Sequence, residues 1–233
     1  MNTSESLSRI PMLIIKFKNE LRHGEIPFFR GAVISKVPQE LTLFHNHIDD
    51  GFRYHYPLIQ YKRIGGKAAI VCIGEGTDAI GNFFANADFD LQIGNRQEHF
   101  VVENVDAKRV LIQTWQSEFH YTLRKWLPLN QENYAQYQAL EGVAAKALFL
   151  QKILVGNILS LCTGLGIHIE EDISCEIVTL SDITTYKYKG VRMSGFDLEF
   201  KTNVSLPDYL GLGKGVSLGY GMIHKNRITN DKQ

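Results

Sequence analysis

The chain has 233 residues, of which 44% are hydrophobic and 21% are charged, and its 25 basic side chains balance 25 acidic ones. This composition excludes a disordered or collagen-like chain, and the length allows one large domain or two small ones without a metal or disulfide staple. A net charge of zero also counts against a generic nucleic-acid-binding protein, because such proteins are usually basic.

The first half of the chain alternates between strand-like and helix-like segments. Apolar β-branched runs predict the strands, and the pair Gly65-Gly66 between two such runs is a strong hairpin signal. One helix is expected to stop before Pro38. In chain order we predict a strand over 10–18, a helix over 26–37, strands over 56–64 and 67–73, a helix over 74–85, and strands over 100–105 and 108–115 around Asp106-Ala107. This order is the ferredoxin-like pattern.

The second half repeats the scheme of a strand, a helix and then several strands. A long amphipathic segment ends at Gly164, a residue that favours helix C-termini. We predict a strand over 119–127, a helix over 132–162, strands over 167–179, 184–192 and 196–205, a glycine-rich loop over 207–215 and a last strand over 216–223. The predicted fold class is therefore α+β, with tandem ferredoxin-like (RRM-like) domains over residues 1–118 and 119–233.

The cysteines and the apolar segments predict a cytoplasmic protein. Cys72, Cys162 and Cys175 are odd in number and share no CxxC spacing, which favours reduced thiols. The N-terminus has no positively charged region ahead of a long apolar stretch, so we expect no signal peptide. The most apolar window, Ala144 to Ile167, is interrupted by lysine and amide side chains, so we expect no membrane span.

Residues 43–57 (LFHNHIDDGFRYHYP) hold three of the eight histidines and two tyrosines. Cleavage of RNA without a metal needs a base for the 2′-hydroxyl, an acid for the departing 5′-oxygen and donors to the phosphorane. Histidine serves as either acid or base near neutral pH. In an extended segment His45 and His47 point to one side, roughly 7 Å apart, and so could flank a phosphate. Tyr54 or Tyr56 could donate to an oxygen of that phosphate.

Other interpretations of this segment stay open at this point. Lys62 or Arg63 could offset charge near the histidines, but the histidines could equally cap turns or contact Asp49 and Asp50 in a polar loop. The pattern His45-x-His47-x-Asp49 also resembles the start of the HxHxDH motif of metallo-hydrolases. Here the last position of that motif is aspartate, and no regularly spaced further ligands follow.

Residues 210–221 (LGLGKGVSLGYG) carry five of the twenty glycines. The segment is not a Walker motif, because Lys214 is followed by glycine rather than serine or threonine. A glycine-dense loop exposes backbone N–H groups at close range, and such a nest suits a phosphate backbone. The alternative is a set of tight turns with a strand packed closely against a neighbour. A weaker signal is the alternation TTYKYK over 184–189, which could contact RNA but more simply indicates a hairpin with its lysines in solvent.

With both motifs and the tandem pattern together, the chain resembles the repeat-cleaving endoribonucleases of CRISPR systems, the Cas-six type within the RAMP superfamily. The segment GLGKGVSLGYG looks like the glycine-rich loop of that family, and FHNHIDDGFRYHYPLIQYK looks like the catalytic stretch of the branch that uses two histidines and a tyrosine. The resemblance implies metal-independent cleavage within the repeat of a CRISPR precursor RNA, with a 2′,3′-cyclic phosphate (or 3′-phosphate) end and a 5′-hydroxyl end as products and with no cofactor.

The resemblance also assigns roles to residues and leaves partners open. His45 and His47 would be general base and general acid in an unassigned order, and Tyr54 would position the phosphate. Association into a homodimer or with a CRISPR effector complex is left open, and no membrane partner is expected. The alternatives are a non-catalytic RNA-binding subunit of the same superfamily and a metal-dependent hydrolase using His45, His47 and Asp49. The residues expected to hold the repeat RNA are Arg53, Lys62, Gly211, Gly213, Lys214, Gly215 and Ser217.

Overall fold

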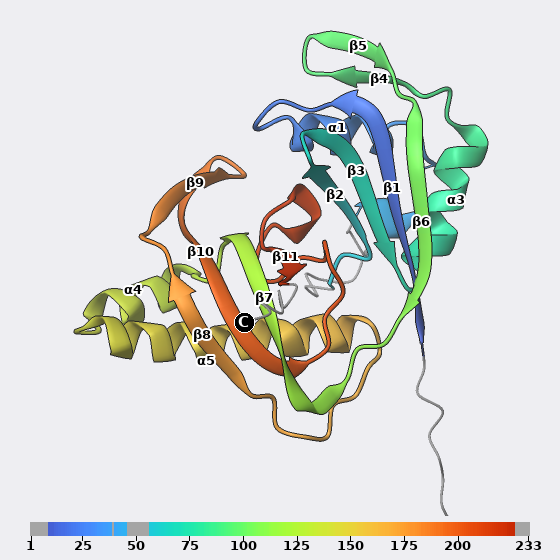
Figure 1. The fold of residues 1–233 in the computed structure, drawn as a ribbon. Helices are drawn as coiled ribbons and strands as arrows, with labels where there is room; N and C mark the ends of the chain where they lie inside the picture. Colours follow the sequence, from blue (N-terminus) through green and yellow to red (C-terminus); the bar gives the residue numbers. More distant parts are fainter. Residues whose placement is uncertain (1–8, 39, 46–55, 227–233) are drawn as a thin grey trace, which may run out of the picture. The chain divides into compact units, whose positions relative to one another are not determined.

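The computed structural model describes residues 9–38, 40–45 and 56–226 (Figure 1). The chain divides into two compact units: unit 1 comprises Met1–Leu111 with Ser217–Gly219, and unit 2 comprises Ile112–Val216 with Tyr220–Gln233. The division falls before the predicted boundary at residue 118, because the first strand of unit 2 already begins at Thr114 and pairs within the second sheet.

Unit 1 is a four-stranded antiparallel sheet with helices inserted between its strands. The strand order is β2-β3-β1-β6, and a separate two-stranded ribbon joins β4 to β5. This order, with a helix after the first strand and another after the third, is the ferredoxin-like arrangement. The elements are β1 (Ile10–Glu20), α1 (Ile26–Ile34), α2 (Thr42–His45), β2 (Ile59–Ile64), β3 (Lys67–Ile73), α3 (Gly76–Asn86), β4 (Asp90–Ile93), β5 (Arg96–His99) and β6 (Val102–Val110).

Aromatic rings fill the core of unit 1. The ring of Phe29 on α1 lies 5.8 Å from that of Phe17 on β1, 5.8 Å from that of Tyr61 on β2 and 5.4 Å from that of Phe100. All four side chains are buried. Burying one side chain of this size stabilises the fold by roughly 1.5–3 kcal/mol, so this group fixes α1 firmly onto its sheet.

The structure confirms the hairpin of unit 1 and revises its last strands. Gly65-Gly66 joins β2 to β3 as predicted. The predicted break at Asp106-Ala107 was wrong: both residues pair with β1, and β6 is one uninterrupted strand. The β4–β5 hairpin was not predicted from the sequence, although its Gly94-Asn95 turn is a favoured two-residue connection.

Unit 2 repeats the ferredoxin-like order in a second antiparallel sheet, β11-β7-β10-β8, with β9 pairing to β10. The predicted fold class of tandem ferredoxin-like domains is therefore confirmed. The elements are β7 (Thr114–Trp126), α4 (Gln131–Ala139), α5 (Val143–Gly164), β8 (Cys175–Leu180), β9 (Thr184–Tyr188), β10 (Val191–Val204), the 3₁₀ turn η1 (Val216–Leu218) and β11 (Met222–Lys225).

Helix α5 provides the core face of unit 2. By length and composition it could cross a membrane, and 28% of its apolar window is buried. Leu150, Leu154, Ile158 and Leu161 repeat at helical spacing and are fully buried, so one face of the helix packs into unit 2. Its Gln151 side chain accepts a hydrogen bond of 3.1 Å from the backbone N–H of Ile177 on β8, the terminal strand of this sheet.

The segments predicted in unit 2 differ from the structure at four places. The single helix predicted over 132–162 is broken into α4 and α5, because Gly142 has φ = 78°, a backbone conformation that no α-helix contains. The strand predicted from residue 167 begins only at Cys175. Two strands expected over 184–205 share a turn at Lys189-Gly190, so that β10 starts at Val191. The strand expected over 216–223 is instead η1 followed by the short β11.

Candidate nucleic-acid interface

Of the predicted catalytic residues, His45 alone lies within the part of the chain that the structure describes. His45 is the last residue of α2, so its backbone is helical and not extended as the sequence analysis assumed. His47, Arg53 and Tyr54 lie outside the described residues. The expected pairing of two imidazoles around one phosphate therefore stays a prediction.

The helix that carries His45 is tied to α1. Phe44 is buried in the core of unit 1, and the Arg30 Nη2 atom donates a hydrogen bond of 3.4 Å to the Phe44 carbonyl oxygen. The Arg30 Nε atom and the Tyr61 hydroxyl are also buried, and neither has a hydrogen-bond partner among the described residues. Burial raises the pKa of Tyr61, so this phenol stays neutral. Arg30 was not predicted from the sequence, although it is the one charged residue of α1.

Lys62 is not a surface cation. It lies in β2 opposite Ala69, its side chain is fully buried, and burial lowers the pKa of its ammonium to about 7. A buried ammonium presents no donor at the surface of the described structure, so contact of Lys62 with RNA stays a prediction. The neighbouring Arg63 also turns inward, with its Nε atom donating a hydrogen bond of 2.6 Å to the Leu21 carbonyl.

Close packing explains why several positions of the glycine-rich loop require glycine. A Cβ atom at Gly221 would lie 1.9 Å from the Leu212 carbonyl oxygen, and one at Gly213 would lie 2.8 Å from the Trp126 ring nitrogen. Any side chain at either position would therefore displace the loop. Gly211 pairs with Met222 in an isolated bridge. These contacts match the alternative of tight turns and close packing that the sequence left open.

Two backbone amides of the loop have no hydrogen-bond partner among the described residues. The backbone N–H of Lys214 donates to the Leu127 carbonyl at 3.3 Å, whereas those of Gly213 and Gly215 have no partner in the described part of the chain. The Lys214 side chain between them is half-buried, which lowers the pKa of its ammonium. Ser217 is half-buried within η1 and groups with unit 1. Two unbonded amides around one lysine are groups of the kind that bind anions, and RNA binding by this loop stays a prediction.

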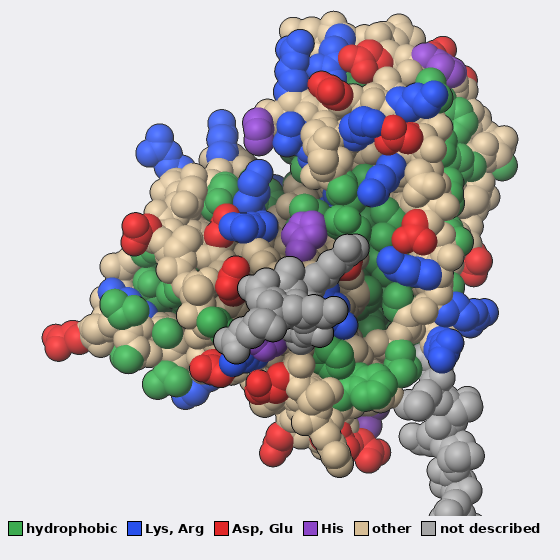
Figure 2. Space-filling view, in the orientation of Figure 1, with side chains coloured by type: hydrophobic (Ala, Val, Ile, Leu, Met, Phe, Trp, Pro, Cys, Tyr) green, Lys and Arg blue, Asp and Glu red, His purple; other side chains and the backbone are tan. Residues whose placement is uncertain are grey.

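The β9–β10 hairpin of unit 2 concentrates exposed positive charge. Lys187 on β9 pairs directly with Arg192 on β10, and Lys189 occupies the turn, where φ is positive for both turn residues. All three side chains are exposed, and Figure 2 shows basic groups projecting from this hairpin. Like charges directly opposite on two strands destabilise the pairing. The arrangement therefore costs stability unless a polyanion lies over it.

The opposite face of this hairpin rests on the end of the glycine-rich loop. The ring of Tyr220 packs edge-on against Tyr186 at 5.9 Å and Tyr188 at 5.8 Å. Its hydroxyl donates a hydrogen bond of 3.0 Å to the Lys187 carbonyl. The tyrosines of the TTYKYK segment are therefore structural, and they leave the lysines on the solvent side of the hairpin.

Comparison with known proteins shows the family. A family model described as the Cas6b N-terminal domain matches residues 8–110, and one described as the Cas6b C-terminal domain matches residues 113–226. The chain belongs to the Cas6b family. The resemblance inferred from the two motifs is thus confirmed, and the two matched regions meet where Cas6b unit 1 gives way to unit 2.

Solved structures resemble this Cas6b protein along most of its length. One, described as a crystal structure of Cas6b, has a TM-score of 0.85 and 30% identity, and the match covers 94% of this chain and all (100%) of that chain. Another, described as CRISPR RNA processing endoribonuclease Cas6b, has a TM-score of 0.73 and 26% identity with the same coverage, 94% and 100%. An uncharacterised protein of Methanocaldococcus jannaschii is 42% identical over 98 residues, which is 42% of this chain and 65% of that curated relative.

The metal-site alternative is untested by the structure. Within residues 9–38, 40–45 and 56–226, no three His, Cys, Asp or Glu side chains are grouped closely enough to hold a metal ion. His47 and Asp49 of the HxHxD segment fall outside these ranges. A metal at that segment therefore stays a competing hypothesis, to be separated by experiment.

Proposed function

We propose that this Cas6b protein is a metal-independent endoribonuclease that cleaves CRISPR repeat RNA in precursor transcripts. The observation that carries the proposal is the match over 94% of the chain to a structure described as a CRISPR RNA processing endoribonuclease of the same family. The histidine-rich segment and the glycine-rich loop support the same function. Because the substrate is a transcript, the proposal places the protein in the cytoplasm.

In the proposed reaction one of His45 and His47 takes the proton of the 2′-hydroxyl. The 2′-oxygen then attacks the adjacent phosphorus, the bond from phosphorus to the 5′-oxygen breaks, and the other imidazole gives a proton to that oxygen. The products are a 2′,3′-cyclic phosphate and a 5′-hydroxyl. Tyr54 is assigned to donate to the phosphate, and Arg30 supports the helix that ends in His45. Two imidazoles suffice for these proton transfers, so the step needs no metal.

The proposed RNA contacts combine the predicted residues with the hairpin found in the structure. In the loop they are the amides of Gly213 and Gly215 and the ammonium of Lys214, while Arg53, Gly211 and Ser217 stay predictions. The exposed cations of the β9–β10 hairpin supply local positive charge that the zero net charge of the chain conceals. A homodimer and a CRISPR effector complex also stay predictions.

Cleavage of the organism's own repeat RNA in EDTA tests the proposal. We expect cleavage to persist in the chelator and to yield a 5′-hydroxyl fragment and a 2′,3′-cyclic phosphate fragment, resolved by gel electrophoresis before and after treatment with phosphatase and kinase. Binding without cleavage would instead identify a non-catalytic RNA-binding subunit. Activity that returns only with added Mn²⁺ or Zn²⁺ would identify a metal-dependent hydrolase that uses His45, His47 and Asp49.

The hairpin cations should matter for affinity. We expect the double variant Lys187→Ala/Arg192→Ala to weaken binding of repeat RNA about tenfold in 0.1 M salt and to reduce the slope of log K against log salt by about two, because two phosphate contacts are lost. Filter binding over a salt series measures both quantities. The control Lys146→Ala/Lys152→Ala on α5 changes the net charge equally. Equal losses of affinity in the two double variants would show that only net charge matters.

A further inference from the structure

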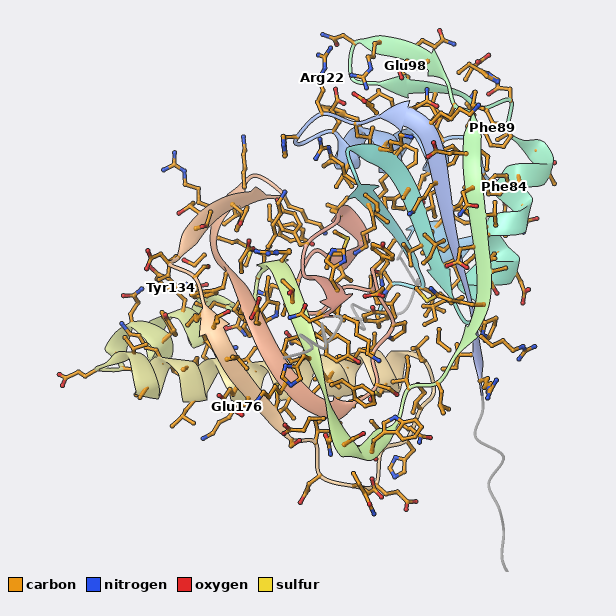
Figure 3. All side chains as sticks on the ribbon, in the orientation of Figure 1. Arg22, Phe84, Phe89, Glu98, Tyr134 and Glu176 are labelled. Atoms are coloured by element: carbon orange, nitrogen blue, oxygen red, sulfur yellow. The ribbon has the colours of Figure 1, made fainter. Side chains whose placement is uncertain are left out.

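A groove in unit 1 lies between α1 and the β4–β5 hairpin, away from the histidine-rich segment in the sequence. Its volume is about 830 Å³, which lies within the usual range for small-molecule sites. Figure 3 labels Arg22 and Glu98 at the end of unit 1 that carries this hairpin. The side chains that line the groove and bear on its chemistry are Arg22, Glu25, Phe28, Gln92, Asn95 and Arg96.

One wall of the groove presents a fixed guanidinium plane. The Arg96 Nη1 and Nη2 atoms donate to the two carboxylate oxygens of Glu25 at 2.7 and 3.1 Å, and its Nε atom donates to Glu98. Burial alone would raise the pKa of Glu25, but hydrogen bonds from the Arg22 amide and from Arg96 outweigh it and hold the pKa below its usual value. A guanidinium held this way is a preorganised surface for stacking on a planar ring.

A second π surface comes from the first turn of α1. Phe28 is 54% exposed, whereas the adjacent Phe29 is fully buried in the core. Single exposed apolar residues are common on protein surfaces, but Phe28 lines a groove that also contains the fixed Arg96 plane. An aromatic ring and an arginine plane in one groove are the two kinds of side chain that stack on unpaired RNA bases.

The polar groups of the groove suit the remaining parts of a nucleotide. The guanidinium of Arg22 is exposed and has no hydrogen-bond partner in the described residues, so it can meet a phosphate. The carboxamide of Asn95, at the hairpin turn, is likewise exposed and unbonded there, and it offers both a donor and an acceptor to a base edge. Gln92 is already bonded to the Gly94 carbonyl at 2.8 Å and so shapes the rim.

We propose that this groove binds one unpaired RNA nucleotide, with its base stacked on Phe28 and Arg96 and its phosphate at Arg22. The proposal rests on the proposed function, which supplies single-stranded RNA beside the cleaved repeat. A duplex is excluded as the occupant, because a base must leave its stack to reach two ring-stacking side chains inside a groove. The groove therefore grips sequence flanking the cut without taking part in the chemistry.

Binding of 5′-fluorescein-labelled decauridylate, followed by fluorescence anisotropy, tests the groove directly. We expect Phe28→Ala to weaken binding about tenfold, since one base loses its aromatic surface, and Phe28→Trp to restore or tighten it. Both substitutions are at an exposed position, so the fold should be retained. The control Val105→Ala removes another exposed apolar side chain of unit 1 (51% exposed) and should leave the affinity unchanged.

A second variant, at Gly31, tests the groove by filling it and not by removing a side chain that contacts the RNA. It lies in α1, lines the groove and has no atom within 4 Å of the position that a Cβ would take. Gly31→Leu should therefore fill the groove and weaken decauridylate binding about tenfold, while a better helix former raises the melting temperature of the protein. Weak binding together with a raised melting temperature cannot result from misfolding.

The same variants separate this proposal from the proposed function. Suppose that repeat RNA is cleaved in EDTA, but decauridylate either fails to bind the wild type or binds the wild type, Phe28→Ala and Gly31→Leu equally well. The groove proposal is then overturned, and the proposed function stands. If decauridylate binding depends on Phe28 and Gly31 but no repeat RNA is cleaved, the groove stands and the proposed function fails.

Discussion

Repeat RNA with a single 2′-deoxy substitution at the cut site is expected to resist cleavage completely while binding as tightly as the unmodified RNA. The proposed nucleophile is the 2′-oxygen of that nucleotide, and replacing the hydroxyl with hydrogen removes it without changing the phosphate charge that dominates affinity. Single-turnover cleavage, with filter binding on the same RNA, measures both quantities.

One further RNA completes this experiment. A 2′-deoxy substitution one nucleotide away from the cut is the matched control and should be cleaved at the normal rate. Cleavage of the RNA that is modified at the cut site would show that water or another group attacks the phosphorus, and it would turn attention to the HxHxD segment as a metal site.

His45→Ala and His47→Ala should each slow the chemical step by about 10²–10⁴-fold, because each removes one of the two proton transfers. The double variant should be slower than either single variant by less than the product of their effects, since the two groups act as a unit. His23→Ala, at an exposed histidine of the same unit, is the control for any general effect of losing an imidazole.

The measurement for these variants is the single-turnover rate at saturating protein, so that weaker binding does not pass for slower chemistry. Binding of the 2′-deoxy RNA should change little in either single variant. Cleavage at the wild-type rate by both single variants would refute the assignment of His45 and His47, whereas loss in only one would leave a single histidine as acid or base.

Local signals were enough to predict the fold class. Gly65-Gly66 marks a hairpin through backbone conformations that other residues avoid, and the buried run over Lys67–Ile73 could only be a strand at that length. The boundaries failed where tertiary structure overrides local pattern. Nothing in the sequence around Asp106 shows that β1 pairs with it, and Gly142 breaks a run whose apolar spacing continues across it.

The candidate site was less accessible to sequence reasoning, for a physical reason. Lys62 reads as a cation beside the histidines, and nothing in the sequence around it shows that its side chain is fully buried. The glycines of residues 211–221 read as a phosphate nest, but contacts with Trp126 of β7 and with Leu212 of the loop itself account for Gly213 and Gly221. Arg30 carried a usable signal as the lone charge in an apolar helix, whereas the pairing of Lys187 with Arg192 depends on the register of β9 and β10.

The Gln151 side chain on α5 has a consequence for how the protein behaves at high concentration. The terminal strand of a sheet exposes backbone donors and acceptors that can recruit a strand from another molecule and begin aggregation. On β8 the N–H of Ile177 is already satisfied by Gln151, so an incoming chain would find that donor occupied. A helix side chain thus occupies one of the donors through which this sheet margin could pair with another molecule.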